Sequence, residues 1–140
     1  MQTRRGFRAT SAAARQDGAK LVRIAIIGAG KVGTTLGRGW TRHRHQVTYG
    51  VRDPEGERAV ALAQEGVGVA LPAAAVARSE VVVLATPWAG AKAAVEALGD
   101  LGGRPLLDAT NPIGPGLTLA VGRAAPGASW CRRGRRPPAW

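Results

Sequence analysis

Residues 24–33 read I-A-I-I-G-A-G-K-V-G, an aliphatic run followed at once by glycines at positions 28, 30 and 33. Residues 32–40 are mostly small or apolar and continue with helical character. A buried strand, a glycine-rich turn and a helix in this order are typical of a dinucleotide-binding unit. The stretch therefore predicts that the chain holds a pyrophosphate, before any residue indicates a reaction.

The three glycines have different physical tasks. Gly28 allows the tight turn off the strand, Gly30 lets a phosphate approach a backbone without a Cβ, and Gly33 lets the helix pack closely. The unpaired N–H groups and the dipole of the first helical turn complete an anion site. Lys31 either adds positive charge to this site or is a solvated surface lysine. The predicted pyrophosphate-binding residues are Gly28, Ala29, Gly30, Lys31, Val32 and Gly33.

Apolar runs alternate with helical stretches through the middle of the chain. This alternation predicts βαβ units and a parallel sheet. We expect strands at residues 22–27, 46–51, 67–70, 81–85 and 105–108, and helices at residues 31–42, 54–64, 72–77 and 88–98. The predicted fold class is α/β: a Rossmann-like, doubly wound parallel sheet of strand order 3-2-1-4-5, in a single domain over residues 21–122.

The end of the second predicted strand distinguishes NAD from NADP. An acidic residue there binds the ribose 2′-hydroxyl, whereas an arginine pairs with a 2′-phosphate. Here Arg52 comes first, and Asp53 follows it directly before Pro54. Asp53 either binds the ribose or caps a helix that starts at Pro54, and the capping alternative leaves Arg52 for a phosphate. We therefore expect NADP(H) as the cofactor.

Five segments are recognisable together: 26–33 (IIGAGKVG), 45–47 (HQV), 50–54 (GVRDP), 82–88 (VVLATPW) and 107–112 (LDATNP). Over about residues 22–122 the chain resembles the N-terminal domain of the NADPH-dependent deazaflavin-coenzyme reductases, and more distantly the pyrroline-5-carboxylate reductases. In the reductase family this domain binds NADP, and C4 of the nicotinamide exchanges hydride with a deazaflavin ring. The resemblance implies that residues 28–33 hold the pyrophosphate and that Arg52 binds the 2′-phosphate. It also implies that Thr86, Pro87 and Asn111 line the nicotinamide end.

The chain departs from the family pattern at two positions. Val51 stands where the family commonly has Ser or Thr, so one hydroxyl contact to the 2′-phosphate is missing. Arg44 stands where the family often has Gly, before the His-x-Val pair. If this position after the first helix is left-handed, an arginine there costs about 1 kcal/mol.

The formal net charge of +11 is concentrated in the two ends of the chain. Residues 1–20 contribute +4, residues 123–140 contribute +5, and residues 21–122 contribute only +2. Because the predicted domain is nearly balanced, we expect no specific nucleic-acid site on it. The ends can bind polyanions non-specifically. No apolar run approaches the roughly 20 residues that cross a membrane, so no membrane partner is expected.

We expect both ends to be disordered. For residues 1–20, a transit peptide, a start codon placed too early and a plain extension all fit the composition. Residues 123–140 show no period and no strand run, and a truncated or frame-shifted reading frame is the simplest hypothesis for them.

With 140 residues the chain is too short for a Rossmann domain and a substrate domain. The single cysteine, Cys131, fits a cytoplasmic location.

The sequence does not indicate catalytic residues. Asp108 is either a general acid or a cap for the following loop through backbone N–H groups. Trp88 either stacks on nicotinamide or packs at a helix start. His43 and His45 have no cluster of further ligands near them in the sequence, so no metal site is expected.

Three functions remain open at this point. The first is an oxidoreductase that transfers hydride between NADPH and a deazaflavin coenzyme or related small acceptor, complete only with a partner chain or as a homo-oligomer. The second is a truncated nucleotide-binding module without turnover, and the third is a polyanion binder that acts through the basic ends. Since the cofactor carries the chemistry of hydride transfer, the lack of an acid–base motif does not exclude an enzyme.

Overall fold

The computed structural model describes residues 20–113 and residue 116. The strands are β1 (Arg23–Ile27), β2 (Gln46–Gly50), β3 (Gly68–Ala70), β4 (Val81–Leu84) and β5 (Leu106–Asp108). The helices are α1 (Lys31–Arg42), α2 (Glu57–Gln64), α3 (Pro72–Ala77) and α4 (Trp88–Glu96). The strands form one parallel sheet in the order β3-β2-β1-β4-β5, which confirms the predicted α/β, Rossmann-like topology. The predictions for residues 1–19 and 123–140 lie outside the described residues.

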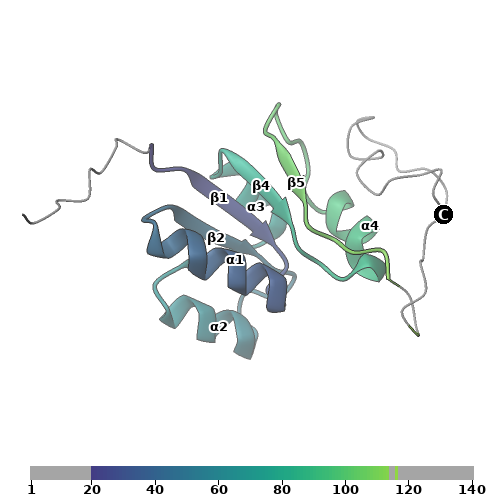
Figure 1. Ribbon diagram of the computed structural model, residues 1–140, viewed down its shortest axis with the longest axis horizontal. Coiled ribbons are helices and arrows are strands. Elements are labelled where there is room, and N and C mark those ends of the chain that lie inside the picture. Colours follow the sequence, from purple (N-terminus) through teal and green to yellow (C-terminus); the bar gives the residue numbers. More distant parts are fainter. Residues whose placement is uncertain (1–19, 114–115, 117–140) are drawn as a thin grey trace, which may run out of the picture.

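The helices cover the two faces of the sheet in two layers (Figure 1). Alternate residues of the central strand β1 enter two separate apolar clusters, as the period of two in a strand requires. Ala25 and Ile27 pack with α3 and α4, whereas Ile24 and Ile26 pack with α1 and α2. All four are at most 6% exposed, so the unbroken aliphatic run reflects burial on both faces. The glycine turn therefore follows the central strand of the sheet, which is buried on both faces.

α1 lies close to the sheet because two of its turns carry glycine on the inner face. Gly33 and Gly37 are both buried. A Cβ on Gly37 would overlap the hydroxyl of Tyr49, a β2 residue that is 1% exposed. Burial in this position raises the pKa of Tyr49 above its ordinary value. The close approach therefore holds the middle of α1 against β2.

Most predicted bounds agree with the structure to within two residues, and α1 and α3 have the predicted bounds. The start of α2 was predicted at Pro54 and is wrong, because this helix begins at Glu57 with Gly56 in an extended conformation before it. Asp53 Oδ1 accepts the N–H of Glu55 at 3.2 Å, and the N–H of Gly56 donates to the carbonyl of Asp53 at 3.3 Å. Asp53 therefore stabilises a local turn instead of capping the helix.

The link from α1 to β2 contains Arg44, for which the sequence analysis considered a left-handed conformation, and the residue has that conformation. Arg44 has φ +66°, which makes it the non-glycine residue with positive φ in the described part of the chain. Its N–H donates to the carbonyl of Thr41 at 2.9 Å, and the N–H of His45 donates to the carbonyl of Trp40 at 3.1 Å. The helix thus ends in the way that glycine usually allows.

The helices of the described residues are short. The longest, α1, has 12 residues, whereas a span of a bilayer needs roughly 20. Within residues 20–113, no helix has the length and apolar character that a membrane crossing requires.

Candidate nucleotide-binding site

The glycine turn between β1 and α1 has the geometry that its spacing predicts. Gly28 has φ +103°, and a Cβ on it would lie 2.7 Å from the carbonyl oxygen of Ala85, which follows β4. A Cβ on Gly33 would overlap the carbonyl oxygen of Gly28, so the helix can only start this close with glycine. A Cβ on Gly30 would meet no described atom within 4 Å. Gly28 and Gly33 are therefore required by packing, and Gly30 faces open space.

The first turn of α1 presents partial positive charge to this open space. Gly30 is the N-cap residue, with no side-chain hydrogen bond to the cap and no acidic residue in the first turn. The first N–H groups of any α-helix lack partners within the helix and favour an anion. Lys31 and Val32 are exposed here, and Ala29 packs against the apolar cluster that contains Ile24 and Ile26. The turn can hold a phosphate group through backbone donors.

Arg52 stands at the end of β2, beyond the last residue held by the sheet. The N–H of Val51 still donates to the carbonyl of Ala70 at 2.9 Å, and the chain turns away after it. Arg52 is exposed and has no hydrogen bond or ion pair with the described part of the chain. Because the Asp53 carboxylate is engaged in its own turn, the Arg52 guanidinium keeps its donors for a ligand.

Thr86 follows β4 and carries an unusual hydroxyl. Its Oγ1 is buried and has no hydrogen-bond partner in residues 20–113. Its Cγ2 lies 3.1 Å from the Cβ position of Gly28, so the end of β4 and the glycine turn are in contact. A buried hydroxyl without a partner costs about 1–3 kcal/mol. A ligand that supplies the partner recovers this cost, which makes Thr86 a candidate ligand contact.

The loop after β5 is ordered by an aspartate. Asp108 Oδ1 accepts both the N–H of Thr110, at 2.9 Å, and its hydroxyl, at 2.6 Å. This is the capping role that competed with a general acid in the sequence analysis. The N–H of Ala109 donates to the carbonyl of Leu84 at 2.9 Å and holds the loop beside the end of β4. Asn111 and Pro87 are exposed at the ends of these two strands, and Pro87 is the N-cap residue of α4.

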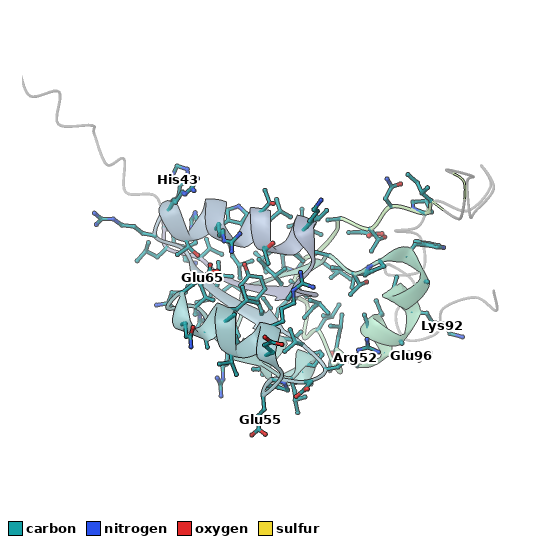
Figure 2. All side chains as sticks on the ribbon, turned by 90° about the horizontal axis from the view of Figure 1, so that it is seen from below. His43, Arg52, Glu55, Glu65, Lys92 and Glu96 are labelled. Carbon is teal, nitrogen blue, oxygen red and sulfur yellow. The ribbon has the colours of Figure 1, made fainter. Side chains whose placement is uncertain are left out.

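The predicted site residues share one edge of the sheet. The glycine turn, Arg52, Thr86 and Asn111 follow the carboxyl ends of β1, β2, β4 and β5, which are parallel neighbours. In Figure 2, Arg52 lies at the opposite end of the domain from His43, which follows α1. Ligands of doubly wound sheets bind at the carboxyl edge, where the strand order reverses.

Sequence reasoning missed one glycine that shapes this edge. Gly50 is the last residue of β2, and a Cβ on it would lie 2.6 Å from Ile27 Cδ1 and 3.1 Å from Pro72 Cα. Its carbonyl holds the glycine turn, because it accepts the N–H of Gly28 at 3.1 Å. A glycine inside a strand pattern signals a close backbone approach, and that signal was present in the sequence.

The described residues contain no cluster of His, Cys, Asp and Glu that could hold a metal ion. The donors at the carboxyl edge are backbone N–H groups, a guanidinium and a hydroxyl. These groups suit a phosphorylated organic ligand.

Comparison with known proteins identifies the family. The family described as "NADP oxidoreductase coenzyme F420-dependent" matches residues 23–112, well over half of the chain. The chain belongs to this family. The match begins at β1 and ends one residue after Asn111, so it contains every predicted site residue. No curated protein matches the chain.

Among solved structures, the chain is similar to a putative F420-dependent NADP-reductase from Arthrobacter sp. FB24, with 33% identity and a TM-score of 0.58 over 65% of this chain. It is also similar to an imine reductase from Pseudomonas sp., with 25% identity and a TM-score of 0.56 over 66% of this chain. A pyrroline carboxylate reductase from Plasmodium falciparum with NADP bound shares the fold, with 11% identity and a TM-score of 0.52 over 68% of this chain. Family membership shows that this is an NADP-binding Rossmann domain of an oxidoreductase family.

The match covers only part of each of these proteins. It spans 46% of the Arthrobacter reductase, 33% of the Pseudomonas imine reductase and 36% of the Plasmodium reductase. The comparison therefore concerns the nucleotide-binding part of those proteins and not the rest of their chains.

Proposed function

We propose that this domain binds NADPH along the carboxyl edge of its sheet, as the nucleotide half of an enzyme that transfers hydride to a deazaflavin coenzyme or a related small acceptor. In this proposal the backbone N–H groups of residues 28–33 hold the pyrophosphate. Arg52 binds the 2′-phosphate, and Thr86, Pro87 and Asn111 line the nicotinamide end.

The buried Thr86 hydroxyl beside the glycine turn is the observation that carries the proposal. A solvated turn of structural use only would not need a polar atom that is buried without a partner. The residue lies against Gly28, where a dinucleotide would cross from the glycine turn toward β4. Family membership supports the same reading.

The chain's own residues would act by binding and orienting. The N-terminal turn of α1 attracts the pyrophosphate, and Lys31 adds a mobile positive charge there. The planar guanidinium of Arg52 can form two parallel hydrogen bonds to a phosphate. NADPH supplies a hydride from C4 of the nicotinamide when bound, and the protein's part is to fix the face and distance at which the acceptor meets it.

The 2′-phosphate assignment is tested by calorimetric titration of the full chain and its Arg52→Ala variant with NADPH and with NADH. Hydrogen bonds to charged groups contribute about 1.5–3 kcal/mol, so the variant should bind NADPH roughly 10–100-fold more weakly. NADH lacks the 2′-phosphate, and its affinity should not change. Arg58→Ala removes another exposed arginine near the start of α2 and serves as the matched control.

An equal loss of affinity for both nucleotides would contradict the assignment, since it would mean that Arg52 acts on the fold or on a shared group. Unchanged NADPH affinity would overturn it outright.

A nucleotide-binding module without turnover is the second candidate, because the groups at the carboxyl edge are suited to binding and the sequence indicates no catalytic residue. Oxidation of NADPH in the presence of a deazaflavin acceptor separates the two candidates. Turnover by the purified full chain supports the oxidoreductase. Binding without turnover supports the module, and turnover restored by an added partner chain would show that the acceptor half is supplied in trans.

The partners that follow from the proposal are the nucleotide, a small hydride acceptor and a second copy or partner chain that completes the acceptor side. A cytoplasmic location is part of the same proposal, because a solitary cysteine fits a reducing compartment.

A further inference from the structure

A hollow lies at the amino edge of the sheet, opposite the carboxyl edge at which we propose that the nucleotide binds. It has a volume of about 390 Å³ and lies between the end of α3 and the first residues of β1 and β2. Its lining includes Arg23, Gln46, Thr48, Arg78 and Ser79. No residue of the proposed nucleotide site takes part in it.

The hollow exists because α3 is shorter than the strands it covers. α3 has only six residues, and its Ala75 packs on Gly50 at the far end of β2. Gln46 and Thr48 are on the same face of β2 as Gly50, because side chains of a strand alternate. Arg23 pairs in register with Gln46 and shares a face with Ala25 and Ile27, which pack on α3. Polar side chains therefore stand where the helix no longer covers the sheet.

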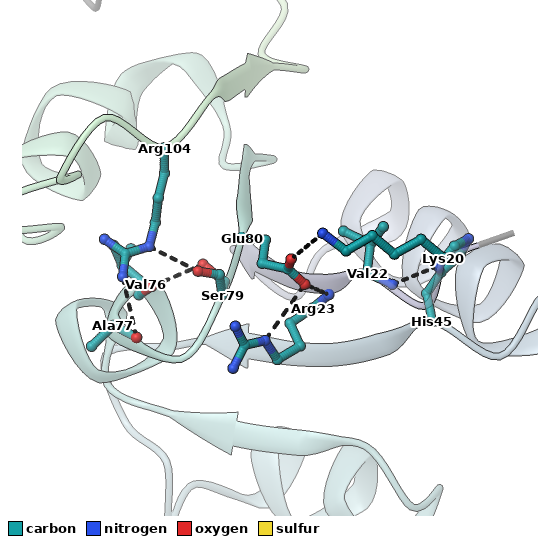
Figure 3. Close-up of polar contacts among 9 residues, drawn as sticks. All are labelled: Lys20, Val22, Arg23, His45, Val76, Ala77, Ser79, Glu80 and Arg104. Carbon is teal, nitrogen blue, oxygen red and sulfur yellow. Dashed lines mark hydrogen bonds and ion pairs between the residues drawn. The ribbon is translucent and has the colours of Figure 1, made fainter.

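The negative end of α3 is already neutralised by another residue. Arg104 donates to the carbonyl of Ser79 at 2.8 Å and to the carbonyl of Ala77 at 3.3 Å, as Figure 3 shows. The Ser79 hydroxyl donates to the carbonyl of Val76 at 2.9 Å. Free helix C-terminal carbonyls would repel an anion, and here several are occupied by donors.

The nearest carboxylate is engaged as well. Glu80 accepts the N–H of Arg23 at 3.1 Å and pairs with Lys20 at 3.2 Å and with Arg23 Nε at 3.5 Å (Figure 3). The two terminal nitrogens of Arg23 have no partner among residues 20–113, and neither does the guanidinium of Arg78. The hollow is thus lined by the side chains of two arginines, by one amide and by two hydroxyl groups, and no carboxylate is in its lining.

We propose that this hollow is a second ligand site, which takes a small organic anion with a carboxylate or phosphate group. The guanidinium groups of Arg23 and Arg78 would bind the oxyanion, since their planar forks match both carboxylate and phosphate. Gln46 and Thr48 would contact a polar part of the same molecule. The volume falls within the range of about 300–1,000 Å³ that holds small metabolites.

The test is a titration of the isotope-labelled full chain, saturated with NADPH, followed by the shifts of its backbone amide signals. Succinate and inorganic phosphate are the two probes, and they distinguish a carboxylate ligand from a phosphate ligand. At least one of them should shift the signals of Arg23, Thr48, Arg78 and Ser79 in a saturable way. Amide signals separate binding in this hollow from any non-specific attraction of the anion to the arginines of residues 123–140.

Arg78→Ala should weaken the saturable binding at least tenfold, whereas Arg58→Ala should leave it unchanged. Shifts that do not saturate with either probe, or saturable shifts that survive Arg78→Ala, would overturn the proposal. If NADPH itself fails to bind, the same titration is run on the chain alone, so the two proposals fail or succeed separately.

Discussion

The buried hydroxyl of Thr86 should lower the stability of the free domain and raise its affinity for NADPH. Thr86→Val removes the buried hydroxyl and keeps the shape of the side chain. The free protein should keep or increase its stability, because a buried donor without a partner is lost. The affinity for NADPH should fall about 2–10-fold, the value of one neutral hydrogen bond. Thermal unfolding and calorimetry measure the two effects, and unchanged NADPH affinity would remove Thr86 from the site.

Arg44 should be replaceable by glycine with a gain in stability. Its φ of +66° disfavours any side chain with a Cβ, and its own side chain has no partner in the described residues. Arg44→Gly should stabilise the domain by about 0.5–1 kcal/mol, after the greater unfolded-state entropy of glycine is included. The control is Arg42→Gly, inside the last turn of α1, which should destabilise by a similar amount. Urea unfolding of both variants decides the matter, and a loss of stability in Arg44→Gly would refute the strain.

The sequence predicted the roles of single residues where steric contact alone decides them. The roles of Gly28 and Gly33 follow from steric contact, and the structure confirms those contacts. The choice between two roles for Asp108 depended on a neighbour, Thr110, that a motif does not weigh. Thr86 lies where the end of β4 meets the glycine turn after β1, and no local pattern reveals that its hydroxyl is buried there.

Among the elements, α1 depends on two glycines and tolerates a change at a third. Gly33→Ala would push the start of α1 off the glycine turn, so it should destabilise by about 1–3 kcal/mol and abolish tight NADPH binding. Gly39 is in the same helix, and a Cβ on it meets no described atom within 4 Å. Gly39→Ala should therefore stabilise by up to about 1 kcal/mol. Equal effects of the two substitutions on unfolding would contradict the packing argument.

The contact between α1 and α2 should be sensitive to acid. Arg38 donates to both carboxylate oxygens of Glu65, at 2.7 and 3.1 Å, and this hydrogen bonding lowers the pKa of Glu65 below its ordinary range. A lowered pKa means that the contribution to stability is complete above the unfolded-state pKa of about 4.3, and is lost as the pH falls through the folded value. Urea unfolding should show Glu65→Gln less stable than the natural chain at neutral pH and equal to it in strong acid. Glu55→Gln, in an exposed turn, is the control, and a difference that persists in acid would exclude the ion pair as its source.

The periodicity of the sequence predicted all nine strands and helices of the described residues. The start of α2 is a boundary that periodicity did not predict. The helical pattern is satisfied from Pro54, which is a good first residue for a helix. The competing turn needs only one side-chain hydrogen bond, from the N–H of Glu55 to Asp53 Oδ1. It also needs glycine at position 56, because a Cβ there would lie 2.8 Å from Asp53 Oδ2. Such local competition has a small free-energy difference, which a residue pattern does not resolve.

For the whole molecule, the strand order was predictable because parallel βαβ units have one handedness, and the structure confirms it. The carboxyl edge stays the predicted place of the nucleotide, because ligands of such sheets bind there. The hollow at the amino edge was not predictable, because it results from the unequal lengths of α3 and the strands under it. Its arginines, Arg23 and Arg78, are 55 positions apart and carry no shared motif. The two edges thus carry two separate proposals, a nucleotide site at the carboxyl edge and an anion site at the amino edge.

The most direct test of the account is to map NADPH binding on the full chain by backbone amide shifts. We expect saturable changes at residues 30–33, at Arg52 and at Thr86, and little change at Arg78 and Ser79 on the opposite edge. NADH should perturb the glycine turn but not Arg52. Changes centred on the amino edge, or no saturable change at the glycine turn, would contradict the claim that this domain holds NADP at the carboxyl edge of its sheet.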